Sequence, residues 1–574
     1  MSSTPPLAAP LTDGPAPDRA GAGGRLLGWG RRILGLDTPG AGTNVTTVLH
    51  GDEVEGRGLD ATETSYLHRI RLLGATGTVL MAVGALGAGA QPVLQNPVQG
   101  VRGLGLAARM PSASLTLAMT GTALVILSWL LLGRFAIGRR DEDGAPRRLS
   151  RSQLDRTLLL WIVPLVVAPP MFSKDVYSYL AQSEIAARGL DPYAIGPAGA
   201  LGVDHVLTRT VPNIWRDTPA PYGPAFLWIG EKITHLTGEN IVAGIFVHRL
   251  LALVGVALIV WALPRLARRC GVASVSALWL GAANPLLLFH LVAGIHNEAL
   301  MLGLMLAGVE LALRGVYVAE STTRLQVAGW LAAGTALIAL SSMVKVPSLL
   351  ALGFVGMALA RRWGGTLRAV LAAAAVLAVG AGVVIVLVSW GSGLGLGWTK
   401  TLGTATEVRS WMSIPTLLGM GTGLGGVLLG LGDHTTAVLS ITRPIAAFVA
   451  AVVTVRMLLA VLTGRIHPVG ALGVSLGAIV LLFPVVQPWY LLWAVIPLAA
   501  WATRPVFRIP TIAFSSVVGM ILMPNGGEYQ PFVIVQASIV TIVVVGLLIV
   551  ATRSRLPWRL QERTPPRPAE TTGA

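Results

Sequence analysis

Long apolar runs recur along most of this chain of 574 residues. Runs of about 18 or more apolar residues, the length that crosses a bilayer as a helix, occur repeatedly between Leu72 and Val550. Hydrophobic residues make up 53% of the chain and charged residues only 12%, about half the charged share of an ordinary globular domain. A soluble protein of this length needs a polar surface that these residues cannot supply. The sequence therefore predicts an all-α polytopic membrane protein.

The formal net charge of +16 comes mainly from arginine, in short clusters beside the apolar runs. A basic chain can indicate nucleic-acid binding, but basic clusters flanking apolar runs are typical of the cytoplasmic ends of membrane spans. We therefore expect membrane lipids and no nucleic acid as partners. The single cysteine, Cys270, excludes an internal disulfide and any cysteine-based metal or redox centre.

Placing every arginine cluster in the cytoplasm requires an even number of spans between neighbouring clusters, which about fourteen helices satisfy. The expected spans are 72–91, 113–133, 155–171, 242–264, 274–293, 298–314, 325–343, 347–361, 369–390, 438–460, 469–486, 489–503, 509–524 and 532–551. Two less regular segments, 223–236 and 414–431, are expected to be interfacial or re-entrant on the outer face.

This topology predicts one large membrane domain, residues 61–555, with two loops on the outer face. The first loop is 172–241 and the second is 391–437. Residues 1–60, rich in Pro, Gly, Ala and Thr, and the basic, Pro-rich residues 556–574 are expected to be disordered cytoplasmic tails. The first long apolar run begins too late for a signal peptide.

The first outer loop opens with the segment FSKDVYSYLAQSEIAARGLDPYAIGP, which places Asp175 about one helical turn after an apolar run. Apolar and aromatic side chains form a ragged stripe behind it, which predicts a short amphipathic helix along the membrane surface. Gly189 and Pro192 are expected to end this helix. Asp175 suits two roles that do not exclude each other: a cap for the helix N-terminus, or a carboxylate that carries chemistry.

An Asp directly after a span, followed by tyrosines and GLDPY, is similar to the first outer loop of GT-C glycosyltransferases, polytopic enzymes that use sugars linked to lipid phosphates. With GIHNEALMLGLML, SSMVKVPSLLAL and VVQPWYLLWAVIP, the chain resembles the actinobacterial polyprenol-phosphate-mannose-dependent α-(1→6)-mannopyranosyltransferases of lipomannan assembly. The resemblance covers most of residues 60–555. It implies a GT-C-like bundle of about 13–14 transmembrane helices with outer-face interfacial helices, in a bacterial plasma membrane, with the active site on the periplasmic face.

The resemblance also implies a reaction. Asp175 would be the general base that accepts the proton of the acceptor hydroxyl. One carboxylate suffices because a phosphate leaving group departs without an acid, and the anomeric configuration inverts. The donor would be polyprenyl phosphomannose, and the acceptor a glycolipid, the α-(1→6)-mannan core of lipomannan and lipoarabinomannan precursors. No Walker loop or GxGxxG unit lies in a strand–helix context, which favours a lipid-linked over a nucleotide-linked donor.

Two basic residues are predicted to bind the leaving phosphate. Lys345 lies at the outer end of an expected span, where a charge is costly enough to suggest a function, although the side chain could also extend to the interface. Arg409, on the second outer loop, offers the bidentate geometry that suits phosphate.

Three adjacent polar residues, His296, Asn297 and Glu298, are expected at an outer lip between two spans. They could bind a sugar or, with Asp175, a divalent cation; the alternative is a turn with Asn297 as a helix cap. Similar proteins have Asp after His-Asn, whereas this chain has Glu298. The sequence shows no other cofactor requirement.

Aromatic and amide side chains complete the predicted site: Tyr177, Tyr179, Gln487, Trp489 and Tyr490. Trp and Tyr are common at membrane interfaces, so interfacial anchoring is the alternative to sugar binding. At the level of the whole chain, the alternatives are a GT-C transferase with another donor, such as an arabinosyl lipid, or a flippase for lipid-linked sugars. The absence of an inverted repeat disfavours the flippase.

Overall fold

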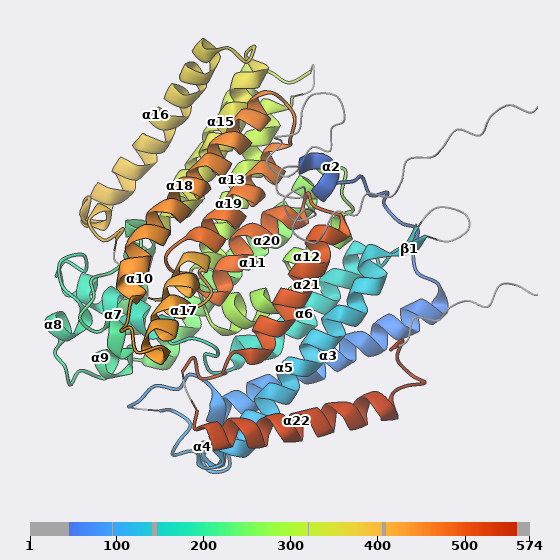
Figure 1. Cartoon of the computed structure of the whole chain (residues 1–574), viewed down its shortest axis with the longest axis vertical. Helices are drawn as coiled ribbons and strands as arrows, with labels where there is room; N and C mark the ends of the chain where they lie inside the picture. Colours follow the sequence, from blue (N-terminus) through green and yellow to red (C-terminus); the bar gives the residue numbers. More distant parts are fainter. Residues whose placement is uncertain are drawn as a thin grey trace, which may run out of the picture.

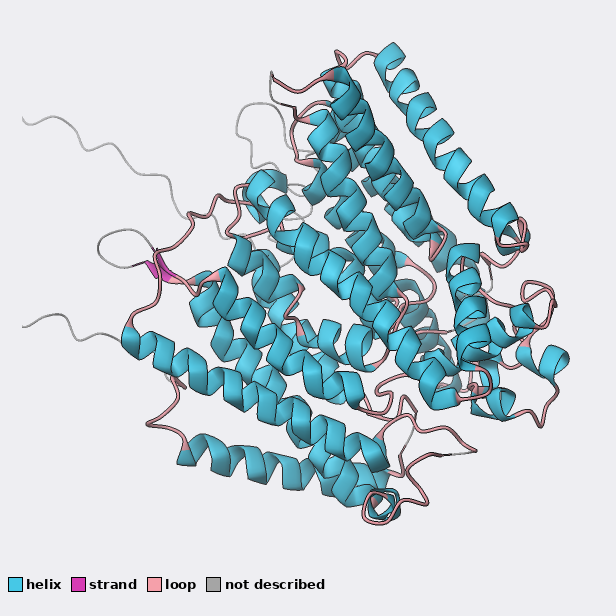
Figure 2. Cartoon of the chain, turned by 180° about the vertical axis from the view of Figure 1, so that it is seen from behind, coloured by secondary structure: helices cyan, strands magenta, loops and turns pink. Residues whose placement is uncertain are grey.

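The computed structural model describes residues 45–94, 96–140, 146–318, 321–403, 409–527 and 529–558. Regular structure in these residues is almost all helical; the strands there are the short antiparallel pair β1 (Arg139–Arg140) and β2 (Pro146–Arg147). The helices lie side by side in one bundle, shown from two sides in Figures 1 and 2. The prediction of an all-α polytopic membrane protein is confirmed.

Eight helices of the described residues are long and apolar enough to cross a membrane, judged by length and composition. They are α3 (Ala61–Ala88), α5 (Pro111–Ile137), α11 (Ile241–Arg269), α13 (Glu298–Val316), α14 (Arg324–Ser342), α16 (Leu367–Gly391), α18 (Thr435–Leu462) and α22 (Pro531–Ala551). Shorter or broken helices pack among them: α6 (Arg151–Val167), α12 (Ser274–Gly281), η2 (Leu287–Ala293), η3 (Val346–Leu349), α15 (Leu350–Arg362), α19 (Pro468–Leu482), η6 (Pro488–Tyr490), α20 (Leu491–Ala499) and α21 (Pro505–Ile521). The connecting segments carry α2 (Val45–Leu49), α4 (Gly105–Arg109), α7 (Asp175–Ala187), α8 (Pro197–Leu201), α9 (Val206–Thr210), η1 (Asn213–Trp215), α10 (Pro224–Thr237), η4 (Gly397–Thr399) and α17 (Ile414–Leu428).

Every expected span overlaps helical structure, but the count of about fourteen overestimates the long regular helices. The span expected at 274–293 divides into α12 and the π-helical η2. The break lies directly before Pro285, and a proline disfavours helical geometry in the residue that precedes it. The segments expected to be irregular, 223–236 and 414–431, form α10 and α17.

The predicted helix after Asp175 is α7, and it ends as expected, with Gly189 at φ +72° just beyond its last residue. It does not lie exposed along a surface. Most of its residues are buried, because α10 and α11 pack against it. We call the end of the bundle that carries α7 to α10 the α7 end; β1, β2 and α2 lie at the opposite end (Figure 1).

The predicted tails fall mainly outside the described residues, which exclude 1–44 and 559–574. The prediction of a disordered tail over residues 1–60 is wrong for residues 45–60, because these residues pack against the bundle. The buried Glu53 carboxylate accepts from Arg508 at 2.7 Å and from Arg148 at 3.4 Å. Two guanidinium groups with one carboxylate between them fix this segment, and composition alone does not reveal such long-range pairing.

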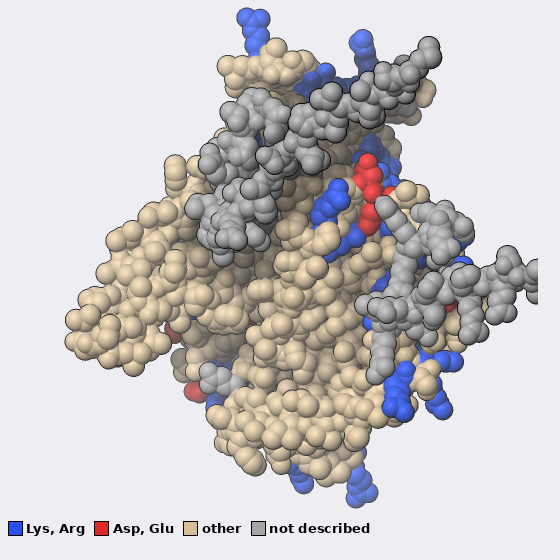
Figure 3. All heavy atoms as spheres, turned by 45° about the vertical axis from the view of Figure 1, so that its right-hand side comes forward, with Lys and Arg blue, Asp and Glu red and all other residues tan. Residues whose placement is uncertain are grey.

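Charged side chains are unevenly distributed over the surface. In Figure 3, Lys and Arg lie along the upper, right-hand and lower edges and in a cluster right of the centre, beside a broad uncharged surface on the left. Such a surface suits the hydrocarbon of a bilayer, where an unpaired charge is costly.

Small residues bring the two central helices α11 and α13 into close contact. A Cβ added at Gly255 of α11 would lie 2.2 Å from the backbone of Ala299, in the first turn of α13. A Cβ at Gly303 would lie 2.4 Å from the Gly255 carbonyl oxygen. Glycine at these positions therefore permits backbone contact between helices, as is common in membrane proteins. This contact holds the first turn of α13, which begins at Glu298, against α11.

Candidate active site

A cavity of about 160 Å³ lies at the α7 end. Its walls come from α7, from the loop 215–222, from the segment that begins η3, and from the chain around η6. The lining residues are Asp175, Ser178, Gln182, Trp215, Thr218, Pro219, Pro221, Tyr222, Lys345, Val346, Pro347, Thr401, Leu402, Phe483, Val485, Gln487, Trp489, Tyr490 and Trp493. Elements far apart in the sequence thus meet around one carboxylate and one ammonium group.

Asp175 is the first residue of α7, but it is not its cap. The N-cap is Lys174, and its side chain makes no capping hydrogen bond. The Asp175 backbone N–H donates to Ser173 Oγ at 3.1 Å, while one carboxylate oxygen lies 3.4 Å from His296 Nδ1. The carboxylate therefore faces the cavity and His296 and leaves helix capping to other groups.

His296 connects Asp175 to a second carboxylate. Its side chain is fully buried, and its Nδ1 lies 3.9 Å from an oxygen of Glu298. The imidazole stacks on Trp489 with ring centres 3.6 Å apart and an interplanar angle of 24°. Stacking on the indole and the two nearby carboxylates hold the ring in one orientation. His296 therefore supports Asp175 from behind, and it does not line the cavity.

Glu298 and Lys345 form a buried ion pair. One Glu298 oxygen accepts from the Lys345 ammonium and, at 3.0 Å, from Trp489 Nε1. Lys345 also donates to the Tyr490 hydroxyl at 3.2 Å, and its ammonium lies within cation–π distance of the Tyr490 and Trp493 rings. Lys345 lines the cavity whereas Glu298 does not, so the carboxylate fixes an ammonium group that a ligand can reach.

The protonation states follow from these contacts. Burial by itself would raise the pKa of Asp175, but His296, Lys345 and Ser173 together outweigh burial and lower the pKa below its usual range. Burial would lower the pKa of Lys345, but Glu298 and Tyr490 outweigh it and raise the pKa. Near neutral pH, the cavity thus presents one ionised carboxylate and one ammonium group.

The two predicted tyrosines of α7 lie behind the cavity wall. The Tyr177 hydroxyl donates to the Ala90 carbonyl at 2.6 Å, which ties α7 to the end of α3. The Tyr179 hydroxyl accepts the Asn297 N–H at 3.4 Å, and its ring meets Tyr222 edge to face. Both residues fix α7 against its neighbours; neither lines the cavity.

Asn297 is the N-cap of α13 by position, but its side chain makes no capping hydrogen bond. Both polar atoms of its buried amide lack a hydrogen-bond partner in the described part of the chain. Of the other predicted residues, Gln487, Trp489 and Tyr490 line the cavity.

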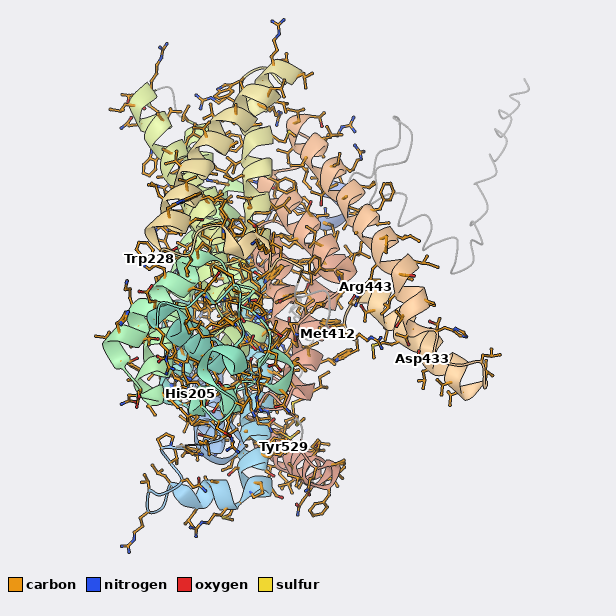
Figure 4. The ribbon with its side chains drawn as sticks, turned by 90° about the vertical axis from the view of Figure 1, so that its left-hand side faces the viewer. His205, Trp228, Met412, Asp433, Arg443 and Tyr529 are labelled. Atoms are coloured by element: carbon orange, nitrogen blue, oxygen red, sulfur yellow. The ribbon has the colours of Figure 1, made fainter. Side chains whose placement is uncertain are left out.

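Arg409 lies apart from this group. Its guanidinium donates to Thr436 Oγ1 at 3.2 Å, in the first turn of α18. Figure 4 labels Asp433, which precedes this turn, and shows it well away from the α7–α10 elements around His205. The structure therefore brings Lys345, and not Arg409, to Asp175.

A divalent cation was the one cofactor that the sequence suggested. Within the described part of the chain, no three His, Cys, Asp or Glu side chains are arranged to hold a metal ion. The Lys345 ammonium already supplies the positive charge beside Glu298. A cation at Asp175 stays a prediction.

Sequence reasoning missed Ser178 and Gln182, which line the cavity with Asp175. Their spacing of three and seven residues from Asp175 places all three on one helix face. The apolar stripe of this segment predicts the helix, and the polar residues on its other face indicate the side that meets a ligand.

Two family models match the chain. The model described as α-(1→6)-mannopyranosyltransferase, N-terminal domain, matches residues 71–361, and the MptB C-terminal domain matches residues 415–550. The first match contains Asp175, His296, Glu298 and Lys345, and the second contains Trp489 and Tyr490. No solved structure gives a significant match.

Relatives are similar over nearly the whole length. A probable α-(1→6)-mannopyranosyltransferase of Mycolicibacterium smegmatis is 59% identical over 91% of this chain and 95% of its own. An α-(1→6)-mannopyranosyltransferase of Mycobacterium tuberculosis is 58% identical over 89% of this chain and 92% of its own. The α-(1→6)-mannopyranosyltransferase B of Corynebacterium glutamicum is 41% identical over 83% of this chain and 80% of its own. The chain therefore belongs to the α-(1→6)-mannopyranosyltransferase family.

Proposed function

We propose that this membrane enzyme transfers mannose from polyprenyl phosphomannose to the α-(1→6)-mannan core of lipomannan and lipoarabinomannan precursors, with Asp175 as general base. The relatives' names support mannosyl transfer with α-(1→6) linkage. The observation that carries the proposal is that one ionised carboxylate and one ammonium group line a single cavity. A carboxylate can take a proton from a hydroxyl, and an ammonium group can stabilise a departing phosphate.

In the proposed reaction, the acceptor hydroxyl oxygen attacks the anomeric carbon of the lipid-linked mannose. The bond from that carbon to the phosphate oxygen breaks, and polyprenyl phosphate leaves with the electron pair. The hydroxyl proton passes to Asp175, and Lys345 stabilises the charge on the departing phosphate. Because the low pKa makes Asp175 a weak base, proton transfer comes late, after the bond to phosphate has largely broken. A β-linked donor then gives an α-linked product by inversion.

We place the cavity on the periplasmic face of the plasma membrane. The α7 end carries the first predicted outer loop, 172–241, and the described parts of the second, 391–437. Several arginine clusters, such as Arg268–Arg269 and Arg361–Arg362, end helices that run away from the cavity. The positive-inside rule assigns such ends to the cytoplasm. A donor bound from the outer leaflet would then keep its prenyl chain in the bilayer while its phosphate meets Lys345.

The test is transfer by membranes that contain the full chain. They receive radiolabelled polyprenyl phosphomannose, or GDP-mannose as the competing donor, with an α-(1→6)-dimannoside acceptor. We expect labelled trimannoside from the lipid donor only, and an α-mannosidase specific for 1→6 linkages should release the label. Transfer from GDP-mannose after depletion of polyprenyl phosphomannose would contradict the donor assignment.

The same assay tests the alternatives. Transfer from an arabinosyl lipid in preference to the mannosyl lipid would indicate a different GT-C donor. Movement of the labelled lipid across the bilayer without a glycosidic product would indicate a flippase. Because Lys345 provides the positive charge, we expect activity to survive EDTA; loss of activity that Mg²⁺ or Mn²⁺ restores would show a cation requirement.

A further inference from the structure

One wall of the cavity is a polar face of α7. Asp175, Ser178 and Gln182 lie on successive turns and all line the cavity. The third and seventh residues after a given helix position share its face. Whatever Asp175 deprotonates must therefore lie beside Ser178 and Gln182.

Two of these side chains each carry a buried polar atom without a hydrogen-bond partner among the described residues. Ser178 is 4% exposed and Gln182 is 3% exposed. Ser178 Oγ and Gln182 Oε1 are both buried without a hydrogen-bond partner. Buried polar atoms are nearly always hydrogen-bonded, because an unpaired one costs stability. Both residues line the cavity, so a rotation of each side chain would bring its unpartnered atom to a group bound there and complete its hydrogen bonds.

The part of the cavity wall outside α7 differs in chemistry. It carries the Lys345 ammonium with the aromatic rings of Tyr490 and Trp493. A phosphate anion belongs there. The α7 wall has neutral hydrogen-bonding groups besides Asp175, and an anion beside that carboxylate would be repelled. The wall at Lys345 therefore suits the phosphate of the donor, and the α7 wall suits the acceptor.

We infer that Ser178 and Gln182 bind hydroxyl groups of the acceptor sugar and hold its attacking hydroxyl at Asp175. This inference rests on the proposed function, since it assigns the acceptor to the wall that carries the base. A glutamine amide both donates and accepts, and a serine hydroxyl does the same. This combination matches the neighbouring hydroxyls of a hexopyranose, each of which also donates and accepts.

The loop 215–222 closes over the same wall and is fixed in place. The Tyr193 hydroxyl donates to the Tyr222 carbonyl at 2.9 Å, and the Ala220 N–H donates to the Pro192 carbonyl at 2.8 Å. Trp215 and Tyr222 of this loop line the cavity. The acceptor wall is therefore preformed, which lowers the cost of ordering it on binding.

The test uses Ser178→Ala and Gln182→Met, which remove the unpaired atoms and nearly keep the volume. The affinity of the purified protein for the α-(1→6)-dimannoside is measured by calorimetry, and the KM of each substrate is measured in the transfer assay. We expect each variant to weaken dimannoside binding and raise acceptor KM about tenfold, the loss of one good hydrogen bond. The KM of polyprenyl phosphomannose should stay within about twofold.

Thermal unfolding separates binding from a structural role. Removing an unpaired buried polar atom should leave the Tm of the unliganded protein unchanged or raise it. Ser183→Ala is the matched control, because Ser183 lies on the same helix but faces Gly230 of α10. It should leave dimannoside affinity and both KM values unchanged.

Three results would overturn the inference: unchanged dimannoside affinity in both variants, a rise confined to the donor KM, or a fall in Tm with both KM values rising together. The proposed function fails separately, if the wild-type protein does not transfer mannose from polyprenyl phosphomannose. Because dimannoside affinity is measured without donor, that failure leaves the test of Ser178 and Gln182 intact.

Discussion

Two non-glycine residues with left-handed backbone stand beside the key side chains. Phe172, at φ +63°, comes three residues before Asp175, and Ile295, at φ +60°, directly precedes His296. A bulky residue in this region is rare and strained, the more so when it is β-branched. Adjacent backbone is held by hydrogen bonds from Met171 N–H to the Ala293 carbonyl and from Phe172 N–H to the Pro524 carbonyl. The surrounding fold thus holds both turns in a conformation that places Asp175 opposite His296.

The pH dependence of the reaction should depend on His296. Because the pKa of Asp175 is lowered, its carboxylate is ionised at neutral pH. It becomes protonated, and can no longer accept a proton, only as the pH falls through that lowered value. His296→Gln removes the neighbour that lowers the pKa of Asp175 most and leaves the effect of burial, which raises that pKa. We expect the acid limb of kcat/KM to move to higher pH. An unchanged acid limb would mean that His296 does not control Asp175.

The Glu298–Lys345 pair should be sensitive to the loss of either partner. Glu298→Gln leaves the Lys345 ammonium, whose side chain is only 17% exposed, without its carboxylate. We expect the free energy of unfolding in detergent to fall by about 3–5 kcal/mol. The double variant Glu298→Gln/Lys345→Met should cost less, because the burial cost of both charges disappears together. Additive losses in the double variant would contradict a coupled pair.

Among the helices, the contact between α11 and α13 has the most direct effect on the site, because His296, Asn297 and Glu298 lie at the start of α13. Gly255→Ala adds a Cβ where the Ala299 backbone lies 2.2 Å away. We expect it to lower stability by about 1–3 kcal/mol and to reduce kcat by displacing Glu298.

Gly382→Ala on α16 is the matched control, because a Cβ there meets nothing within 4 Å. It should be neutral or stabilising by about 0.5–1 kcal/mol, the usual gain from replacing a helical glycine. If both variants behaved alike, the close approach of α11 and α13 would not matter for the site.

The sequence predicts the features of these helices that depend on neighbouring residues, and it does not predict those that depend on contacts between distant parts of the chain. The helix at α7 and its end at Gly189 follow from periodicity and from glycine's tolerance of positive φ. The burial of α7 does not follow, because α10 and α11 come from later in the chain. For the same reason the sequence indicates Glu298 and Lys345 as separate candidates and does not predict that they pair. Arg409 looked equivalent to Lys345 in sequence, and only the fold separates them.

For the whole molecule, the topology predicts opposite accessibility of the two ends. The one cysteine, Cys270, is buried and should react slowly with maleimides. Two exposed positions suit new cysteines: Leu190 at the α7 end, which is 39% exposed, and Trp363 at the opposite end, directly after α15, which is 44% exposed. The variants are Leu190→Cys and Trp363→Cys. A membrane-impermeant maleimide should label the first in intact cells and the second only after permeabilisation. The reverse pattern would place the cavity in the cytoplasm.

The central claim is that Asp175 is the base for mannosyl transfer, and the most direct measurement is the transfer rate of Asp175→Asn. Asparagine keeps the shape of the side chain but cannot take the proton. We predict that kcat with polyprenyl phosphomannose falls by about 10²–10⁴-fold. Glu184→Gln, at the exposed end of α7 where Glu184 pairs with Arg188, should keep wild-type activity. Transfer by Asp175→Asn within about twofold of wild type would contradict the account.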